Sequence, residues 1–143
     1  MIVQGVCVSF LLELGQAIHA LTTDTLKMAL FNSSASLTPT GTTAYSDTNE
    51  ITGTGYSAGG RTLSGVTWSL VDNVPCLDAN DVEWSGATFI ARAALVYNSS
   101  KSNRAVGIID FGAEKSALGN TFRVKFPPPL SEKAFFRLTT FRG

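Results

Sequence analysis

The stretch from Thr42 to Ser69, TTAYSDTNEITGTGYSAGGRTLSGVTWS, carries the most distinctive pattern in the chain. Polar turn residues lead into four closely spaced glycines, and an alternating, strand-like run follows from Leu63. Because glycine adopts positive φ at little steric cost, such a cluster indicates tight turns and close backbone approaches. Arg61 and Thr62 follow the last glycine where a phosphate-binding loop needs Lys and Ser or Thr, and the glycines are wrongly spaced for that loop. The stretch therefore predicts a turned entry into a strand.

The composition of the 143 residues favours one domain that works by contact with other proteins. Hydrophobic residues make up 44 % of the chain and charged residues only 15 %, with a net charge of +0. Soluble monomers usually carry a net charge away from zero, so we expect part of the surface to be covered in a homo-oligomer. Zero net charge argues against nucleic-acid binding. No apolar run is long enough for a membrane span, and no signal peptide is expected.

One helix is expected, over residues 8–21. Phe10, Leu14, Ile18 and Leu21 recur at helical spacing and form one apolar stripe. This register places Glu13, Gln16 and His19 on the other face of the helix.

The remainder reads as short strands separated by turns. Alternation predicts a strand over Thr25–Phe31, a polar loop over Asn32–Thr43, and a central antiparallel pair of Ala87–Asn98 with Arg104–Phe111. The other expected elements are a hairpin of Leu63–Leu70 with the strand around Val74–Leu77, a loop over Gly112–Asn120, a strand over Thr121–Phe126, a connector over Pro127–Pro129 and a last strand over Ala134–Phe141. This pattern predicts a mainly β fold, a single antiparallel β-sandwich domain of jelly-roll or immunoglobulin-like type over residues 1–143, with the helix at 8–21 and strands between 25 and 141.

The sequence offers no assembled set of catalytic or metal-binding residues. His19 is the only histidine, and we interpret it as a helix-surface or hydrogen-bonded core residue rather than a general base. Asp78, Asp81 and Glu83 are interpreted as turn residues rather than a calcium loop or a hydrolase carboxylate pair. We expect no enzymatic activity, no cofactor and no metal.

Two further pairs of residues leave alternatives open. Cys7 and Cys76 lack metal-site spacing and could be buried thiols, one disulfide or halves of intersubunit bonds. Trp68 and Trp84 could form a sugar-binding platform with Tyr45, Tyr56 and Tyr97, although Trp68 alternates in step with apolar residues, which favours the core.

Most of the chain, from Thr23 to Phe126, resembles a family of small tailed-bacteriophage virion proteins. The pieces that carry the resemblance are DTLKMALFNSS (24–34), TAYSDTNEITGTGYSAGG (43–60), LSGV (63–66), WSGATFIARAALVYN (84–98) and NRAVGIIDFG (103–112). The resemblance implies a β-rich, non-enzymatic structural subunit located in the virion, at the neck or collar, on the tail or as a head decoration.

The resemblance also implies partners among the portal or neck, tail or capsid subunits. The alternative function is a receptor- or glycan-binding module of the phage tail. We expect the glycine-rich stretch and the proline connector to supply the subunit interface. The candidate interface residues are Tyr45, Glu50, Tyr56, Arg61, Pro127, Pro128 and Pro129.

Overall fold

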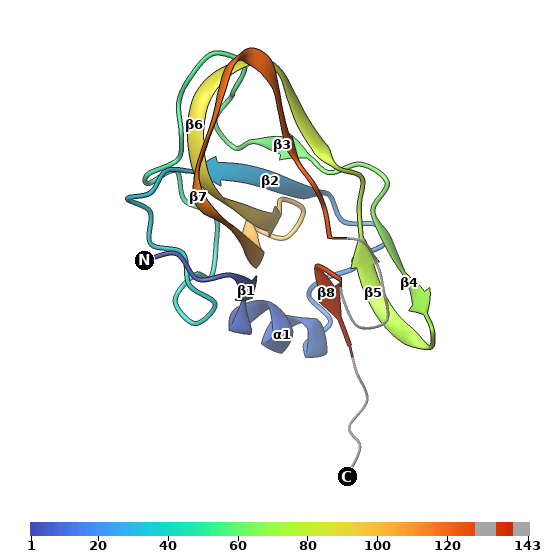
Figure 1. The fold of residues 1–143 in the computed structure, drawn as a ribbon. Helices are drawn as coiled ribbons and strands as arrows, with labels where there is room; N and C mark the ends of the chain where they lie inside the picture. The colour runs from blue at the N-terminus through green and yellow to red at the C-terminus, as the bar shows by residue number, and fades with distance from the viewer. Residues whose placement is uncertain (128–133, 139–143) are drawn as a thin grey trace.

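The fold is mainly β, with two antiparallel sheets and one short helix (Figure 1). The computed structural model describes residues 1–127 and 134–138. The larger sheet has the strand order β1-β7-β6-β2-β3 and the smaller one the order β4-β5-β8. The elements are β1 (Gly5–Val6), α1 (Val8–Gly15), β2 (Leu26–Phe31), β3 (Arg61–Thr62), β4 (Thr67–Val71), β5 (Val74–Asp78), β6 (Val82–Asn98), β7 (Arg104–Val124) and β8 (Phe136–Arg137). The predicted antiparallel β-sandwich is confirmed.

The long hairpin of β6 and β7 is the backbone of the fold. The predicted central pair is confirmed, since Ala94 pairs with Ile109 and Leu95 with Ile108. The predicted loop over Gly112–Asn120 is wrong, because these residues continue β7 up to Val124 and also absorb the separate strand expected over Thr121–Phe126. Exposed polar residues and glycines gave this segment a loop-like composition, although most of it pairs with β6.

The β6–β7 hairpin bends sharply at its middle (Figure 1). Between the pairs Ala91–Lys115 and Ala93–Asp110, β6 advances by two residues and β7 by five, so β7 bulges out. Gly112 lies within this bulge with φ +80°, a conformation that suits glycine. Further register shifts follow Trp84 and Ala87 on β6. The bend divides the hairpin into two arms, which enclose the core between them.

The smaller sheet contains the predicted hairpin in a shorter form. β4 and β5 pair from Thr67–Asp78 to Val71–Val74. Asp72 and Asn73 both have positive φ, as a tight two-residue hairpin turn requires. The strand predicted over Leu63–Leu70 is interrupted, because Gly65 turns the chain with φ +63° between β3 and β4. The predicted last strand is observed only as β8, and residues 139–141 of that prediction lie outside the described residues.

The helix prediction is correct for the start but wrong for the end, because α1 ends at Gly15 rather than at Leu21. Ala17 adopts φ 61°, and the amides of Ala17 and Ile18 donate back to Leu14 O and Glu13 O. This pair of bonds is the usual way to terminate a helix at a left-handed residue. α1 is the only helix in the part of the chain that the structure describes, and its eight residues are too few to cross a bilayer.

One hydrophobic cluster fills the space between the sheets, the hairpin arms and α1. Its largest fully enclosed side chains include Trp84, Phe10, Phe31 and Met28. Cys7 and Cys76 are both buried as thiols, in agreement with the first of the three alternatives given for them.

Candidate functional site

Three of the candidate interface residues meet around one carboxylate. Tyr45 Oη donates to Glu50 Oε1 at 2.5 Å, and Tyr56 Oη donates to Glu50 Oε2 at 2.5 Å. The amide of Gly59 also donates to Oε2, at 2.8 Å. We call Tyr45, Glu50, Tyr56 and Gly59 the Glu50 cluster. Through Glu50 the cluster connects Tyr45, near the start of the glycine-rich stretch (residues 42–69), to Tyr56 and Gly59 further along it. These side chains therefore first stabilise the fold of the chain itself.

The Glu50 cluster is fastened to the two central strands beside it. The Leu30 amide of β2 donates to Tyr56 Oη at 2.9 Å, while Tyr97 Oη of β6 donates to the carbonyl of Gly59 at 2.6 Å. The ring of Tyr45 stacks on that of Tyr97, with 4.6 Å between centroids. Burial raises the pKa of Tyr45 and of Tyr56, and the hydrogen bonds to Glu50 raise both further. The phenols therefore stay protonated and remain donors at physiological pH.

The remaining candidate interface residues are less engaged. Arg61 is exposed and donates from Nη1 to the carbonyl of Glu83 at 2.8 Å. Pro127 is half-buried, and Pro128 and Pro129 lie outside the described residues. The interface role of all seven candidates stays a prediction.

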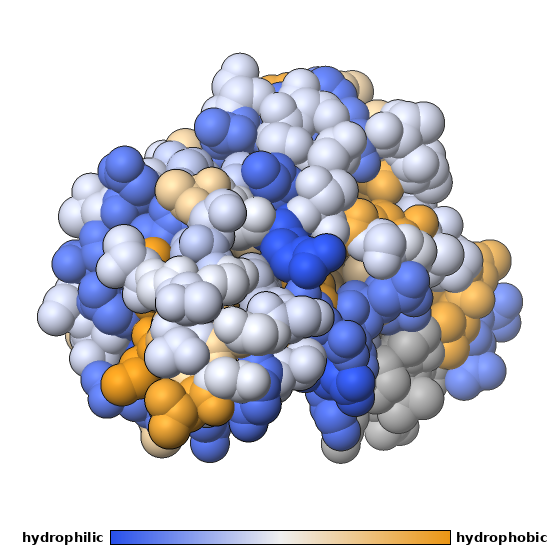
Figure 2. Space-filling model, turned by 90° about the horizontal axis from the view of Figure 1, so that it is seen from above, coloured by the Kyte–Doolittle hydropathy of each residue, from blue (hydrophilic) through white to orange (hydrophobic). Residues whose placement is uncertain are grey.

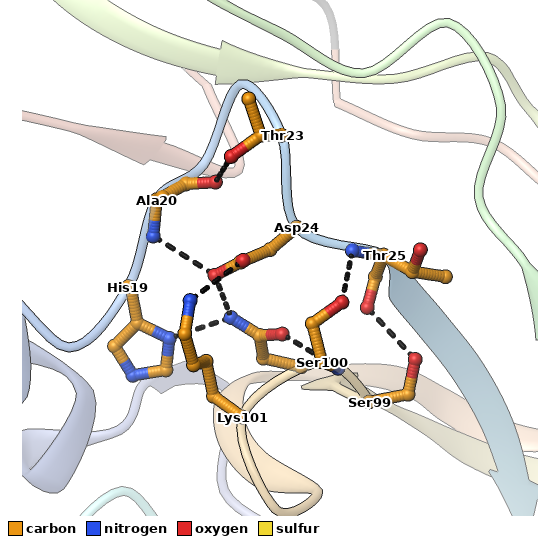
Figure 3. A network of polar contacts seen from close by, with 9 residues as sticks. His19, Ala20, Thr23, Asp24, Thr25, Ser99, Ser100 and Lys101 are labelled. Carbon is orange, nitrogen blue, oxygen red and sulfur yellow. Dashed lines mark hydrogen bonds and ion pairs between the residues drawn. The ribbon is translucent and has the colours of Figure 1, made fainter.

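A second polar network joins α1 to the turn between β6 and β7, and Figure 3 shows the part of it between His19 and Lys101. His19 Nε2 contacts Glu13 Oε1 at 3.0 Å, and Arg104 Nη1 donates to Glu13 Oε2 at 2.7 Å. Asn98 Nδ2 donates to His19 Nδ1 at 2.9 Å and to Asp24 Oδ2 at 2.7 Å. Lys101 completes the network as an ion pair with Asp24 at 2.7 Å. Because Nδ1 accepts from Asn98, Nε2 carries the proton that is donated to Glu13.

Glu13 and His19 were predicted on the helix face opposite the apolar stripe, but both are buried, with the His19 ring 4.7 Å from that of Phe10. Glu13 is 8 % exposed and His19 is 7 % exposed. Burial raises the pKa of Glu13, but hydrogen bonds from His19 and Arg104 outweigh it, so this pKa lies below its ordinary value. Burial likewise opposes the hydrogen bonds to Asp24 from Lys101, Ala20 and Asn98, which leave its pKa lowered. The interpretation of His19 as a hydrogen-bonded core residue is confirmed, and neither ring nitrogen is open to a substrate.

The opposite side of α1 shows the reverse distribution. Val8, Leu11 and Leu12 recur at a spacing of three and four residues and form one stripe. Their exposed fractions are 52 %, 44 % and 64 %. α1 thus buries Phe10 and the carboxylate of Glu13 on one side and exposes an aliphatic stripe on the other, where a surface helix usually carries polar residues.

The acidic and aromatic residues singled out in the sequence do not converge on a site. Asp81 accepts a hydrogen bond from the amide of Phe126, and Glu83 forms an ion pair with Arg123. Within residues 1–127 and 134–138, no three metal-binding side chains come together. Trp84 is buried, and the half-buried Trp68 stacks on Phe136 at 5.7 Å. The two tryptophans therefore do not form an open platform for a sugar.

A groove of about 410 Å³ lies along β7 and is lined by residues from both of its arms. Its apolar lining includes Phe111 and Phe122, whose ring centroids are 6.1 Å apart. Lys115, Arg123 and Lys125 also line it. The sequence predicted a strand over Thr121–Phe126 but not the groove, which requires the bend in β7.

Comparison of the chain with protein families, with curated proteins and with solved structures gives no match. The class that the fold defines is a small antiparallel β-sandwich with a docked N-terminal helix. Its most developed features outside the core are the exposed stripe on α1 and the groove beside β7.

Proposed function

We propose that the chain is a non-enzymatic structural subunit of a tailed-phage virion, as a neck or collar, tail-associated or head-decoration protein. The placement in a virion follows from the resemblance of residues 23–126 to small phage virion proteins. The assembly role is supported by one structural observation, the exposed aliphatic stripe of Val8, Leu11 and Leu12 on α1.

The stripe argues for assembly because α1 is held firmly in this orientation. The bonds of Glu13 to His19 and Arg104 fix the buried side of the helix, so α1 cannot turn its aliphatic side inward without losing them. Fully burying one such side chain contributes about 1.5–3 kcal/mol, and the three in the stripe are roughly half exposed. Covering the stripe is then worth about 3 kcal/mol per copy, too little for a tight dimer but useful in a ring of repeated contacts.

Other apolar side chains are exposed at the same end of the molecule. Leu70, at the end of β4, is 66 % exposed, and Leu138, directly after β8, is 40 % exposed. Figure 1 shows the tip of the β4–β5 hairpin and α1 at this end, away from the bend of β6–β7. Figure 2 views the opposite end, where hydrophilic and near-neutral residues cover most of the surface and hydrophobic patches are separate. We infer that symmetric packing uses the α1 end, against other copies and against portal or neck, tail or capsid subunits.

Sedimentation equilibrium over a wide concentration range tests the self-packing part of this proposal. The chain is expected to reach multiples of its own mass as concentration rises, and Leu12→Lys is expected to remain monomeric. Leu118→Lys is the matched control, since Leu118 is 85 % exposed on β7, where it pairs with Thr88 of β6 and is not part of the α1 stripe. The proposal fails if the chain stays monomeric throughout or if Leu118→Lys weakens association as much as Leu12→Lys.

The alternative function is a receptor- or glycan-binding module of the phage tail. An aromatic platform was its main support, and the positions of Trp68 and Trp84 do not supply one. We therefore favour the assembly role.

A further inference from the structure

The groove beside β7 is lined by the edge of the strand itself. Five consecutive residues, 121–125, line it together with Ile109, Phe111, Lys115 and Ser116 from the other arm and the bend. Consecutive residues of a strand point to opposite faces, so they can line one groove together only along the strand edge. The groove therefore presents backbone as well as side chains.

This edge has no strand beside it in the described part of the chain. β7 pairs with β6 on one side, and on the other side β1 covers only Gly107 and Ile108. The side chain of Gln4 accepts a hydrogen bond from the amide of Asp110, which ends the covered part. Side chains accept from the amides of Gly112, Leu118 and Gly119 in the next part of β7. Between Asn120 and Val124 no strand pairs with this edge in the described residues, so its outward backbone groups are those that an added strand uses.

The charged side chains that line the groove are positive. Lys115 and Lys125 are exposed and form no ion pair within the described residues, while Arg123 pairs with Glu83. Glu114, next to Lys115 in sequence, accepts a hydrogen bond from Ser33 on a different part of the surface. A segment that carries carboxylates would therefore complement this groove.

The opposite side of the hairpin shows how such an edge is closed. There Thr54 of the glycine-rich stretch bridges to Thr88 of β6, and the Thr88 amide donates to Thr54 O at 2.9 Å. Tyr56 places its ring 6.1 Å from Trp84 and 5.9 Å from Phe89. An extended segment with one inserted aromatic ring and a nearby carboxylate thus closes the β6 side from within the chain.

We propose that the groove beside β7 binds an extended acidic segment of a partner protein, which pairs with the β7 edge between Asn120 and Val124. One apolar side chain of that segment lies against Phe111 and Phe122, and its carboxylates contact Lys115 and Lys125. This proposal goes beyond self-packing through α1 and uses a different surface, so either proposal can fail without the other.

Fluorescence anisotropy with a labelled peptide of alternating glutamate and phenylalanine tests the proposal on the full chain. The expected result is saturable binding that an otherwise identical lysine–phenylalanine peptide does not show. Lys125→Glu combined with Lys115→Glu is expected to weaken binding by at least about tenfold, because both contacts become repulsive. For a charge-matched control, two single variants are compared. Lys125→Glu changes a cation of the groove, and Arg61→Glu makes the same change at an exposed cation outside it.

A third peptide, methylated on alternate backbone nitrogens, tests the strand pairing. It keeps the side chains but cannot donate to the β7 edge, so we expect its binding to be lost. The proposal is overturned if the glutamate peptide does not bind, if Arg61→Glu weakens binding as much as Lys125→Glu, or if the methylated peptide binds equally well. Circular dichroism of each variant verifies that loss of binding does not reflect unfolding.

Discussion

The outer edges of β6 and β7 differ in what covers them, although the two strands form one bent hairpin. On the β6 side, the glycine-rich stretch lies against the hairpin, and the Glu50 cluster fastens it. On the β7 side, the groove lined by Phe111 and Phe122 has no such cover among the described residues. The chain closes the β6 edge with its own residues, and we propose that the uncovered β7 edge receives a segment of a partner.

The largest expected effect comes from filling the close approach that seals the β6 side. Gly60 has φ +78°, and a Cβ there would lie 1.8 Å from the carbonyl oxygen of Met28. Gly60→Ala must therefore move β2 or the stretch, at a cost of about 3 kcal/mol or more in the free energy of unfolding. Gly86→Ala is the control, since Gly86 also has positive φ but has no atom within 4 Å of an added Cβ. Its cost is expected near 1–2 kcal/mol. Urea denaturation measures both, and equal losses would show that the close approach is unimportant.

Removing the carboxylate of the Glu50 cluster should have the next largest effect. Glu50→Ala leaves two phenols and the Gly59 amide without their acceptor, and we expect a loss of about 3 kcal/mol. Glu50→Gln keeps one acceptor oxygen and should lose less. A stretch that stays protected from proteolysis near Ala58 in Glu50→Ala would contradict the view that this cluster closes the β6 side.

Acid should weaken the polar network that joins α1 to the β6–β7 turn, because this network holds two carboxylates of lowered pKa. Glu13 and Asp24 both have a pKa below the ordinary value, so their contribution is complete above an ordinary carboxyl pKa of about 4 and is lost as the pH falls through the folded value. We expect the urea midpoint to fall below about pH 4 in the wild type and to fall less steeply in Glu13→Gln. Parallel pH curves for the two proteins would remove Glu13 from this role.

The smallest expected effect on the free energy of unfolding comes from the lysines of the groove beside β7. Lys115→Ala and Lys125→Ala remove exposed cations that form no ion pair in the described residues, so the free energy of unfolding should change by no more than about 0.5 kcal/mol. A loss as large as that of Glu50→Ala, measured by the same urea titration, would mean that the groove is part of the folded core.

Strong local periodicity predicted the central elements of this fold. The alternation in Ala87–Asn98 and the turn at Asp72 and Asn73 led directly to β6 and to the β4–β5 hairpin. The polar composition of residues 112–120 hid the continuation of β7, because an exposed strand and a loop have similar residues. Edge strands are the part of a sheet for which composition is least informative.

The polar networks were not predictable from local pattern. Helical spacing placed Glu13 and His19 opposite the apolar stripe, but their partners Arg104 and Asn98, 91 and 79 residues away in the sequence, hold them inside. Tyr45, Glu50 and Tyr56 were selected for contacts, yet their shared geometry depends on a chain reversal that the sequence does not specify. The glycine cluster did predict the close backbone approach, which Gly60 makes to β2.

Hydrogen exchange of the chain with and without the glutamate–phenylalanine peptide tests the central claim most directly. The claim is that one side of the hairpin is closed by the chain and the other is left for a partner. We expect saturating peptide to slow exchange of amides in Asn120–Val124 and to leave α1 and residues 50–60 unchanged. Slowed exchange confined to α1 or to residues 50–60, or no slowing anywhere, would contradict the claim.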